Sequence, residues 1–169
     1  SLFRTVDLTS PLSIGRTFDV AICLEVAEHL TGSATPTLID TLVSLAPTVV
    51  FSAAHPGQGG QGHVNEQWPA YWHAMFHERG YVALDLLRGP LSEHPDVEEF
   101  YRTNIFLYSH HQRAPRILAE AVSIGTSDPF ILSFTGWMAV SIENQTWRTL
   151  LTALGAKLLH RIWRRRSSS

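Results

Sequence analysis

Two glutamates and a histidine near the start of the chain have the side chains and the spacing of a metal site. Glu25, Glu28 and His29 stand at positions i, i+3 and i+4, so they share one face if this segment is helical. A fourth ligand would be His63 or His55. Mixed carboxylate and imidazole ligands suit Zn²⁺ or Fe²⁺ better than Mg²⁺ or Mn²⁺, although the ligand sets overlap. The alternative is that both glutamates form a solvated helix start, favoured by the helix dipole.

Three histidines are candidate general bases. Because an imidazole titrates close to neutral pH, His29, His55 or His63 could take a proton from a reacting group. The alternatives are that His29 caps a helix start and that His55 makes only a local hydrogen bond.

Two buried strands would bring these residues together. F-D-V-A-I-C-L at 18–24 and T-V-V-F-S-A-A at 48–54 are near-continuous apolar runs, typical of strands buried on both faces of a parallel sheet. Between them the pattern predicts a helix over 36–45, with Thr35 as N-cap and Pro36 at the first position. Ligands bind outside the carboxyl ends of such strands, so we expect the candidate residues to meet at one edge of the sheet.

The next 60 residues extend the same architecture. A helix begins at Pro69 and ends before Gly80, followed by strands predicted at 81–87 and at 101–108. No clear helix separates the last two strands, so we expect a hairpin with an antiparallel strand at the sheet edge. The chain is therefore predicted to be an α/β protein with a Rossmann-like wound, mostly parallel sheet.

The segment between the second strand and the second helix imitates a nucleotide-binding motif. Gly57, Gly59 and Gly62 satisfy G-x-G-x-x-G, with Asp85 about 20 residues further on, near the spacing of the dinucleotide fingerprint. However, His55-Pro56 separates the glycines from the strand, and Asp85 falls inside the apolar strand predicted at 81–87. We interpret the loop as a flexible wall of a ligand pocket, whose glycines let the backbone approach a ligand.

Composition limits the class of protein. The chain has 169 residues, 44% of them hydrophobic and 17% charged, which indicates a soluble globular domain. The single cysteine, Cys23, excludes an internal disulfide framework and favours a reducing compartment, so we expect a cytoplasmic protein. No apolar run is long enough to span a membrane. Residues 1–156 hold 8 basic and 15 acidic residues, a formal charge of −7, so no nucleic-acid partner is expected.

The last twenty residues differ from the rest in charge. Lys157, Arg161 and Arg164–Arg166 alternate with apolar residues over 150–166, the pattern of a helix lying on an anionic membrane surface. The pattern is equally that of a last helix docked on the domain with its arginines in water, which we favour. We divide the chain into a domain over 1–112, an irregular or helical extension over 113–149 and a basic amphipathic helix and tail over 150–169.

F-D-V-A-I-C-L-E-V-A-E-H-L, residues 18–30, resembles the fourth-strand motif of class I S-adenosylmethionine-dependent methyltransferases, in which such a strand leads into an E-x-x-E-H turn beside the reacting methyl group. The loop P-G-Q-G-G-Q-G-H-V-N-E-Q-W-P at 56–69 is similar to that of a subgroup of small members of this family. The resemblance covers roughly residues 1–110 and implies S-adenosylmethionine as cofactor and a small-molecule acceptor, methylated on oxygen or nitrogen.

The resemblance also implies roles for individual residues, listed here by the ligand that they would contact. The cofactor would meet Asp7 and Leu8, where the third strand of the family ends, and Leu24, Glu25 and Val26 after the fourth. E-x-x-E-H clusters in ubiquinone-pathway O-methyltransferases and small-RNA 2′-O-methyltransferases are associated with a divalent ion, which here would involve Glu25, Glu28, His29 and His63. Asn65, Glu66 and Trp68 would line the acceptor pocket, although a place in the core is favoured for Trp68.

One part of the family pattern is missing. The glycine-rich cofactor loop after the first strand and the acid that binds the ribose have no counterpart in the 169 residues. We therefore expect a methyltransferase lacking its front third, inactive as this fragment. The alternative is a non-catalytic remnant that acts as a binding or scaffolding module.

Overall fold

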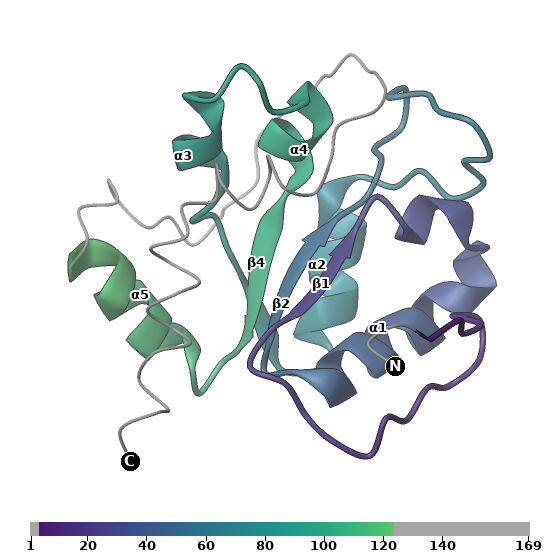
Figure 1. The fold of residues 1–169 in the computed structure, drawn as a ribbon, viewed down its shortest axis with the longest axis horizontal. Coiled ribbons are helices and arrows are strands. Elements are labelled where there is room, and N and C mark those ends of the chain that lie inside the picture. The colour runs from purple at the N-terminus through teal and green to yellow at the C-terminus, as the bar shows by residue number, and fades with distance from the viewer. Residues whose placement is uncertain (1–3, 124–169) are drawn as a thin grey trace.

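The structure is a computed structural model that describes residues 4–123, and its centre is a mixed four-stranded sheet (Figure 1). The strands are β1 (Ala21–Leu24), β2 (Thr48–Ser52), β3 (Tyr81–Leu84) and β4 (Phe106–His110), in the order β1-β2-β4-β3. β1 and β2 are parallel, and β4 runs antiparallel to both of its neighbours. The predicted α/β class is therefore confirmed.

Helices cover both faces of this sheet (Figure 1). They are the 3₁₀ helices η1 (Ala27–His29) and η2 (Gly32–Ala34), and the α-helices α1 (Thr35–Leu45), α2 (Pro69–His77), α3 (Arg88–Ser92), α4 (Glu99–Asn104) and α5 (Ala114–Ser123). α1 and α2 pack on the face that carries Val49 and Phe51, whereas α3 and α5 pack on the face that carries Val50. All five residues of β2 are buried, as its continuous apolar sequence predicts.

The connection from β3 to β4 differs from the prediction. Residues 101–104 belong to α4 and the strand begins only at Phe106, so two short helices replace the expected hairpin. The antiparallel strand β4 also lies between β2 and β3 rather than at the sheet edge. Tertiary contacts outweigh the strand propensity of residues 101–104, because Asn104 is buried and its Nδ2 donates a hydrogen bond to the Gln58 side chain.

Two local predictions are also corrected. The helix α1 begins at Thr35 and its N-cap is Ala34, because the Thr35 hydroxyl accepts a hydrogen bond from Asn65 Nδ2 instead of capping the helix. Asp85 lies just after β3 rather than inside it, and its carboxylate binds Arg88, with Nε and Oδ1 2.7 Å apart.

Residues 124–169 lie outside the described part of the chain, and with them the predicted extension from 124 onward and the basic helix at 150–166. Within residues 4–123, no helix has both the length and the apolar character needed to cross a bilayer.

Candidate metal centre

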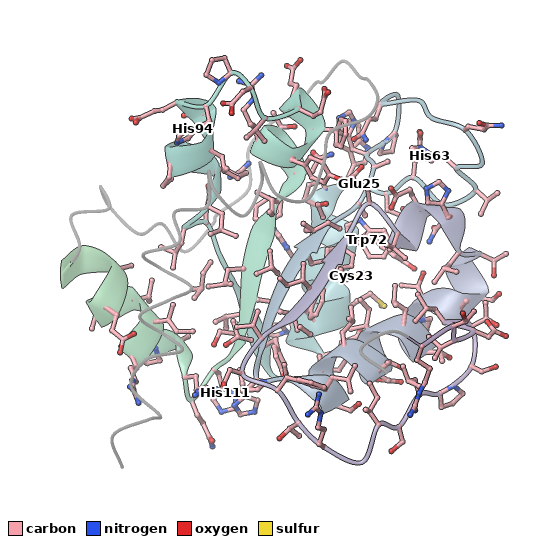
Figure 2. The ribbon with its side chains drawn as sticks, viewed as in Figure 1. Cys23, Glu25, His63, Trp72, His94 and His111 are labelled. Carbon is pink, nitrogen blue, oxygen red and sulfur yellow. The ribbon has the colours of Figure 1, made fainter. Side chains whose placement is uncertain are left out.

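Three of the predicted ligands meet at the carboxyl end of β1. Glu28 and His29 lie in η1, directly after the strand, and His63 lies in the loop between β2 and α2. One ligand atom from each residue lies within 4.8 Å of the other two. Figure 2 shows His63 and Glu25 at this end of the sheet, with His111 at the opposite end. We refer to Glu28, His29 and His63 as the triad.

Glu28 is a fully buried carboxyl group. The residue is 0% exposed, and within residues 4–123 neither side-chain oxygen has a hydrogen-bond partner of good geometry, although the backbone of Glu28 and Ala54 and the carboxyl group of Glu25 lie close enough to influence its pKa. His63 lies opposite this carboxyl group, with 4.0 Å between Glu28 Oε1 and His63 Nε2. Burial and the carboxyl group of Glu25 raise the pKa of Glu28 to about 8. A bound cation would offset the free-energy cost of burying the ionised carboxylate, because its positive charge pairs with the negative charge of Glu28.

His63 is oriented by a second glutamate. Its Nδ1 lies 3.0 Å from Oε1 of Glu66, whose other oxygen accepts a hydrogen bond from the Gly57 N–H at 3.1 Å. The hydrogen bond from His63 lowers the pKa of Glu66. With its proton on Nδ1, the imidazole presents the lone pair of Nε2 toward Glu28. Carboxylates in this position orient metal-binding histidines in many proteins.

His29 has a similar arrangement with a backbone carbonyl. Its Nδ1 lies 3.3 Å from the Gly62 oxygen, which can only accept, so Nε2 keeps its lone pair. The ring is exposed and meets the His63 ring edge-on, with centroids 4.9 Å apart. Its side chain does not cap η1, so the capping alternative for His29 is wrong.

The glycine loop makes room for these two imidazoles. A Cβ on Gly60 would overlap the His63 ring, and one on Gly62 would lie 3.6 Å from Nδ1 of His29. Gly60 is not one of the three glycines that satisfy the dinucleotide pattern. Gly60 and Gly62 therefore lie against the imidazoles of the triad, whereas no atom lies within 4 Å of a Cβ built on Gly57 or Gly59.

Glu25 lies beside the triad rather than within it. The residue follows β1 with a φ of 51°, a strained value for a residue with a side chain. Its Oε2 accepts a hydrogen bond from Gln58 Nε2 at 2.9 Å, and the Gln58 oxygen accepts one from Asn104 Nδ2 at 2.6 Å. Burial is the main cause that raises the pKa of Glu25, and His63 opposes this shift.

His55 is also outside the triad. It is buried, its Nδ1 lies 3.1 Å from the Pro56 oxygen, and its ring stacks on Trp68 with 5.6 Å between centroids. The local hydrogen bond is thus present, as the alternative for His55 states. Trp68 is 42% exposed, so its favoured place in the core is wrong, whereas Trp72 is buried.

The other predicted site residues lie in varied surroundings. Asn65 is buried, and its amide is hydrogen-bonded within the protein: Nδ2 donates to the Thr35 hydroxyl and Oδ1 accepts from Gln67 Nε2. Asp7 is exposed, and its Oδ1 accepts hydrogen bonds from the N–H and hydroxyl of Thr9, which lower its pKa. Leu8 and Val26 are partly buried on the α1–α2 face, and Leu24 is buried on the other face. No contact with the triad is recorded for Asp7 within the described residues.

Two imidazoles and one carboxylate form a ligand set typical of catalytic zinc sites and of non-haem iron sites with open positions. Tetrahedral ligands at roughly 2.0–2.2 Å from one zinc ion lie about 3.4 Å apart. The triad atoms lie within 4.8 Å of one another, so some of them must approach by roughly an ångström to hold an ion. The buried, unpaired oxygens of Glu28 and the oriented His63 fit such an ion. The role of Glu66 was missed from the sequence, although the H-x-x-E spacing contains the signal.

Comparison of the chain with family models, with curated proteins and with solved structures finds no match.

Proposed function

We propose that this chain is the acceptor-binding part of an S-adenosylmethionine-dependent methyltransferase that methylates an oxygen or nitrogen of a small molecule held beside a divalent ion. The observation that supports this proposal is the triad. Glu28 and His29, in the E-V-A-E-H-L turn that resembles the methyltransferase motif, have ligand atoms within 4.8 Å of one from His63, in the glycine loop that also resembles this family. Resemblance at two separate sites of the sequence and closeness of those sites in space are independent observations.

The residues of the chain have distinct roles in this proposal. Glu28, His29 and His63 hold the ion, which polarises the acceptor atom when bound. Glu66 keeps the His63 proton on Nδ1, so that Nε2 stays available. S-adenosylmethionine supplies the methyl group, and the chain aligns the acceptor with it. With both imidazoles used for the ion, His29 and His63 serve as ligands rather than as general bases.

Calorimetric titration with Zn²⁺ and Mn²⁺ tests the ion site. We expect one equivalent to bind to the wild-type chain and the affinity to fall at least roughly 100-fold in His63→Ala, which removes a ligand. His94→Ala is the matched control, because this histidine follows α3, lies well away from His63 and has a side chain 45% exposed (Figure 2). Equal binding by His63→Ala and wild type would overturn the ion site.

Calorimetry with S-adenosylmethionine tests the cofactor. The titration uses the 169-residue chain and, in parallel, the chain extended by any in-frame upstream sequence of its gene. Binding by either protein supports the methyltransferase. Absence of binding by both, with the ion present, would refute it and leave a metal-binding module without this activity.

A further inference from the structure

The glycine loop has a tip with few contacts of its own. We refer to residues 59–63 as the loop tip. Residues 59–62 are exposed, and within residues 4–123 no residue of the tip takes part in a backbone–backbone hydrogen bond. Gly59, Gly60 and Gly62 have positive φ values of 73°, 152° and 78°. Because glycine loses more conformational freedom on ordering than any other residue, the closed tip is costly in entropy.

The chain is fastened on both sides of the loop tip. Before the tip, the Gln58 N–H donates to the His55 oxygen at 3.0 Å, and Gln58 is buried. After the tip, the N–H groups of Val64 and Asn65 both donate to the backbone oxygen of Glu28, at 2.9 and 3.0 Å. The tip is therefore a short exposed segment between two anchors, and such segments open at a low cost in free energy while the core stays intact.

The loop tip is held closed by the triad and Glu66. The Gly62 oxygen lies 3.3 Å from Nδ1 of His29. His63 is itself a residue of the tip, and its Nε2 lies 4.0 Å from Oε1 of Glu28. The Nδ1 atom of His63 lies 3.0 Å from Oε1 of Glu66. Opening of the tip would therefore move His63 away from Glu28 and release the Gly62 carbonyl from His29.

We propose that an ion bound by the triad acts as a latch, which holds the loop tip closed against the turn after β1. Without the ion the tip opens and closes, and with the ion the tip stays closed. This inference rests on the ion site of the proposed function and describes the regulation of that site. It also gives an order of events, because the ion must bind before the tip becomes a fixed wall of the site.

Both imidazoles of the triad connect the ion to the loop tip. When each Nε2 binds the ion, Nδ1 of His29 still faces the Gly62 oxygen and Nδ1 of His63 still faces Glu66. A tip that opens takes His63 with it, so the open state lacks one of three ligands and binds the ion weakly. An ion that binds only the closed state favours that state roughly 100-fold at a concentration of 100 times Kd.

Measurement of ¹⁵N relaxation and relaxation dispersion on the 169-residue chain tests the latch. In chelator, we expect order parameters of about 0.6 or lower at the backbone amides of the tip. One bound equivalent of Zn²⁺ should raise them to about 0.85, the value of a rigid backbone, and remove any exchange broadening. Gly15 is the control within the same molecule, because it is an exposed glycine with a φ of 71° and no atom within 4 Å of its Cβ position. Its relaxation should not change with Zn²⁺.

The His63→Ala variant removes the ligand that belongs to the tip. We expect its tip amides to stay mobile at the Zn²⁺ concentration that loads the wild type, whereas the control His94→Ala should order its tip as the wild type does. Thermal melts in chelator verify that both variants fold. Ordering of the tip by Zn²⁺ in His63→Ala to the same extent as in wild type would overturn the latch.

The outcomes separate the latch from the proposed function. Order parameters near 0.85 without exchange broadening before Zn²⁺ is added would mean that the protein alone closes the tip, and the latch would be wrong. Unchanged mobility of the tip in the Zn²⁺-loaded chain would also overturn it, and either result would leave the ion site standing. Absence of Zn²⁺ binding in calorimetry would overturn the ion site and the latch together. Absence of S-adenosylmethionine binding in a chain whose tip orders with Zn²⁺ would refute the methyltransferase alone.

Discussion

Substituting Gly60 by alanine tests whether the absence of a side chain at this position allows the His63 imidazole to lie beside Glu28. Gly60 has a φ of 152° and its added Cβ would overlap three atoms of the His63 ring. The ring must therefore leave its position beside Glu28, and the triad loses an oriented ligand. Misplacing such a ligand typically weakens metal binding about 10- to 100-fold, which corresponds to roughly 1.4–2.8 kcal/mol.

Gly59→Ala is the matched control for this experiment. Gly59 also has a positive φ, 73°, but no atom lies within 4 Å of the position of its Cβ. Both variants carry backbone strain, about 1–2 kcal/mol for Gly59→Ala and up to about 3 kcal/mol for Gly60→Ala, and only Gly60→Ala displaces His63. The difference in Zn²⁺ affinity between Gly60→Ala and Gly59→Ala therefore separates displacement of the His63 ring from backbone strain in the loop.

The assay is competition for Zn²⁺ against a chromophoric chelator, with thermal unfolding in chelator to measure the strain. We expect both variants to melt below the wild type, Gly60→Ala at the lower temperature, and a lower Zn²⁺ affinity for Gly60→Ala alone. Equal affinities of Gly60→Ala and wild type would refute the reasoning. So would an equal loss in Gly59→Ala, because strain anywhere in the loop would then account for it.

Three further predictions concern the orientation of His63, the buried carboxyl group and the core. Glu66→Ala should weaken Zn²⁺ binding about 10- to 100-fold by releasing His63 Nδ1, with Glu93→Ala as control in the same chelator assay; an unchanged affinity would mean that Glu66 does not orient His63. The pKa of Glu28 is raised from 4.5 to about 8, so the ion-free folded state binds more protons than the unfolded state between these values. The free energy of unfolding of the ion-free protein should therefore fall as pH rises from about 4.5 to about 8. Urea titrations in chelator should show a weaker fall for Glu28→Gln than for wild type. The same slope in variant and wild type would exclude Glu28 as the cause. Phe76→Ala should lower the free energy of unfolding by about 3–5 kcal/mol in urea, because Phe76 is fully buried and stacks on Tyr108; a loss below about 1 kcal/mol would contradict this packing.

The local sequence was sufficient for the elements on which the candidate site depends. The apolar run at 48–54 predicted the buried strand β2, and Pro36 and Pro69 in the first turns of α1 and α2 marked where these helices begin. The run at 18–24 predicted β1, but this strand begins only at Ala21, lies at the sheet edge and leaves Ile22 47% exposed rather than buried. These signals act within a few residues of the chain, through backbone conformation and burial. The rule that parallel strands present their carboxyl ends to a ligand then placed Glu28, His29 and His63 near one another.

Tertiary contacts decided the rest of the site. Gln58 and Asn104 hold Glu25 beside the triad, and Glu66 binds the His63 ring. The position of β4 between β2 and β3 also depends on pairing between segments far apart in the sequence. The position of Glu25, the orientation of Glu66 and the order of the strands all depend on hydrogen bonds or packing that form only when the chain is folded. Periodicity and residue type describe what a segment prefers by itself, and they do not specify which distant side chain will satisfy a buried polar group.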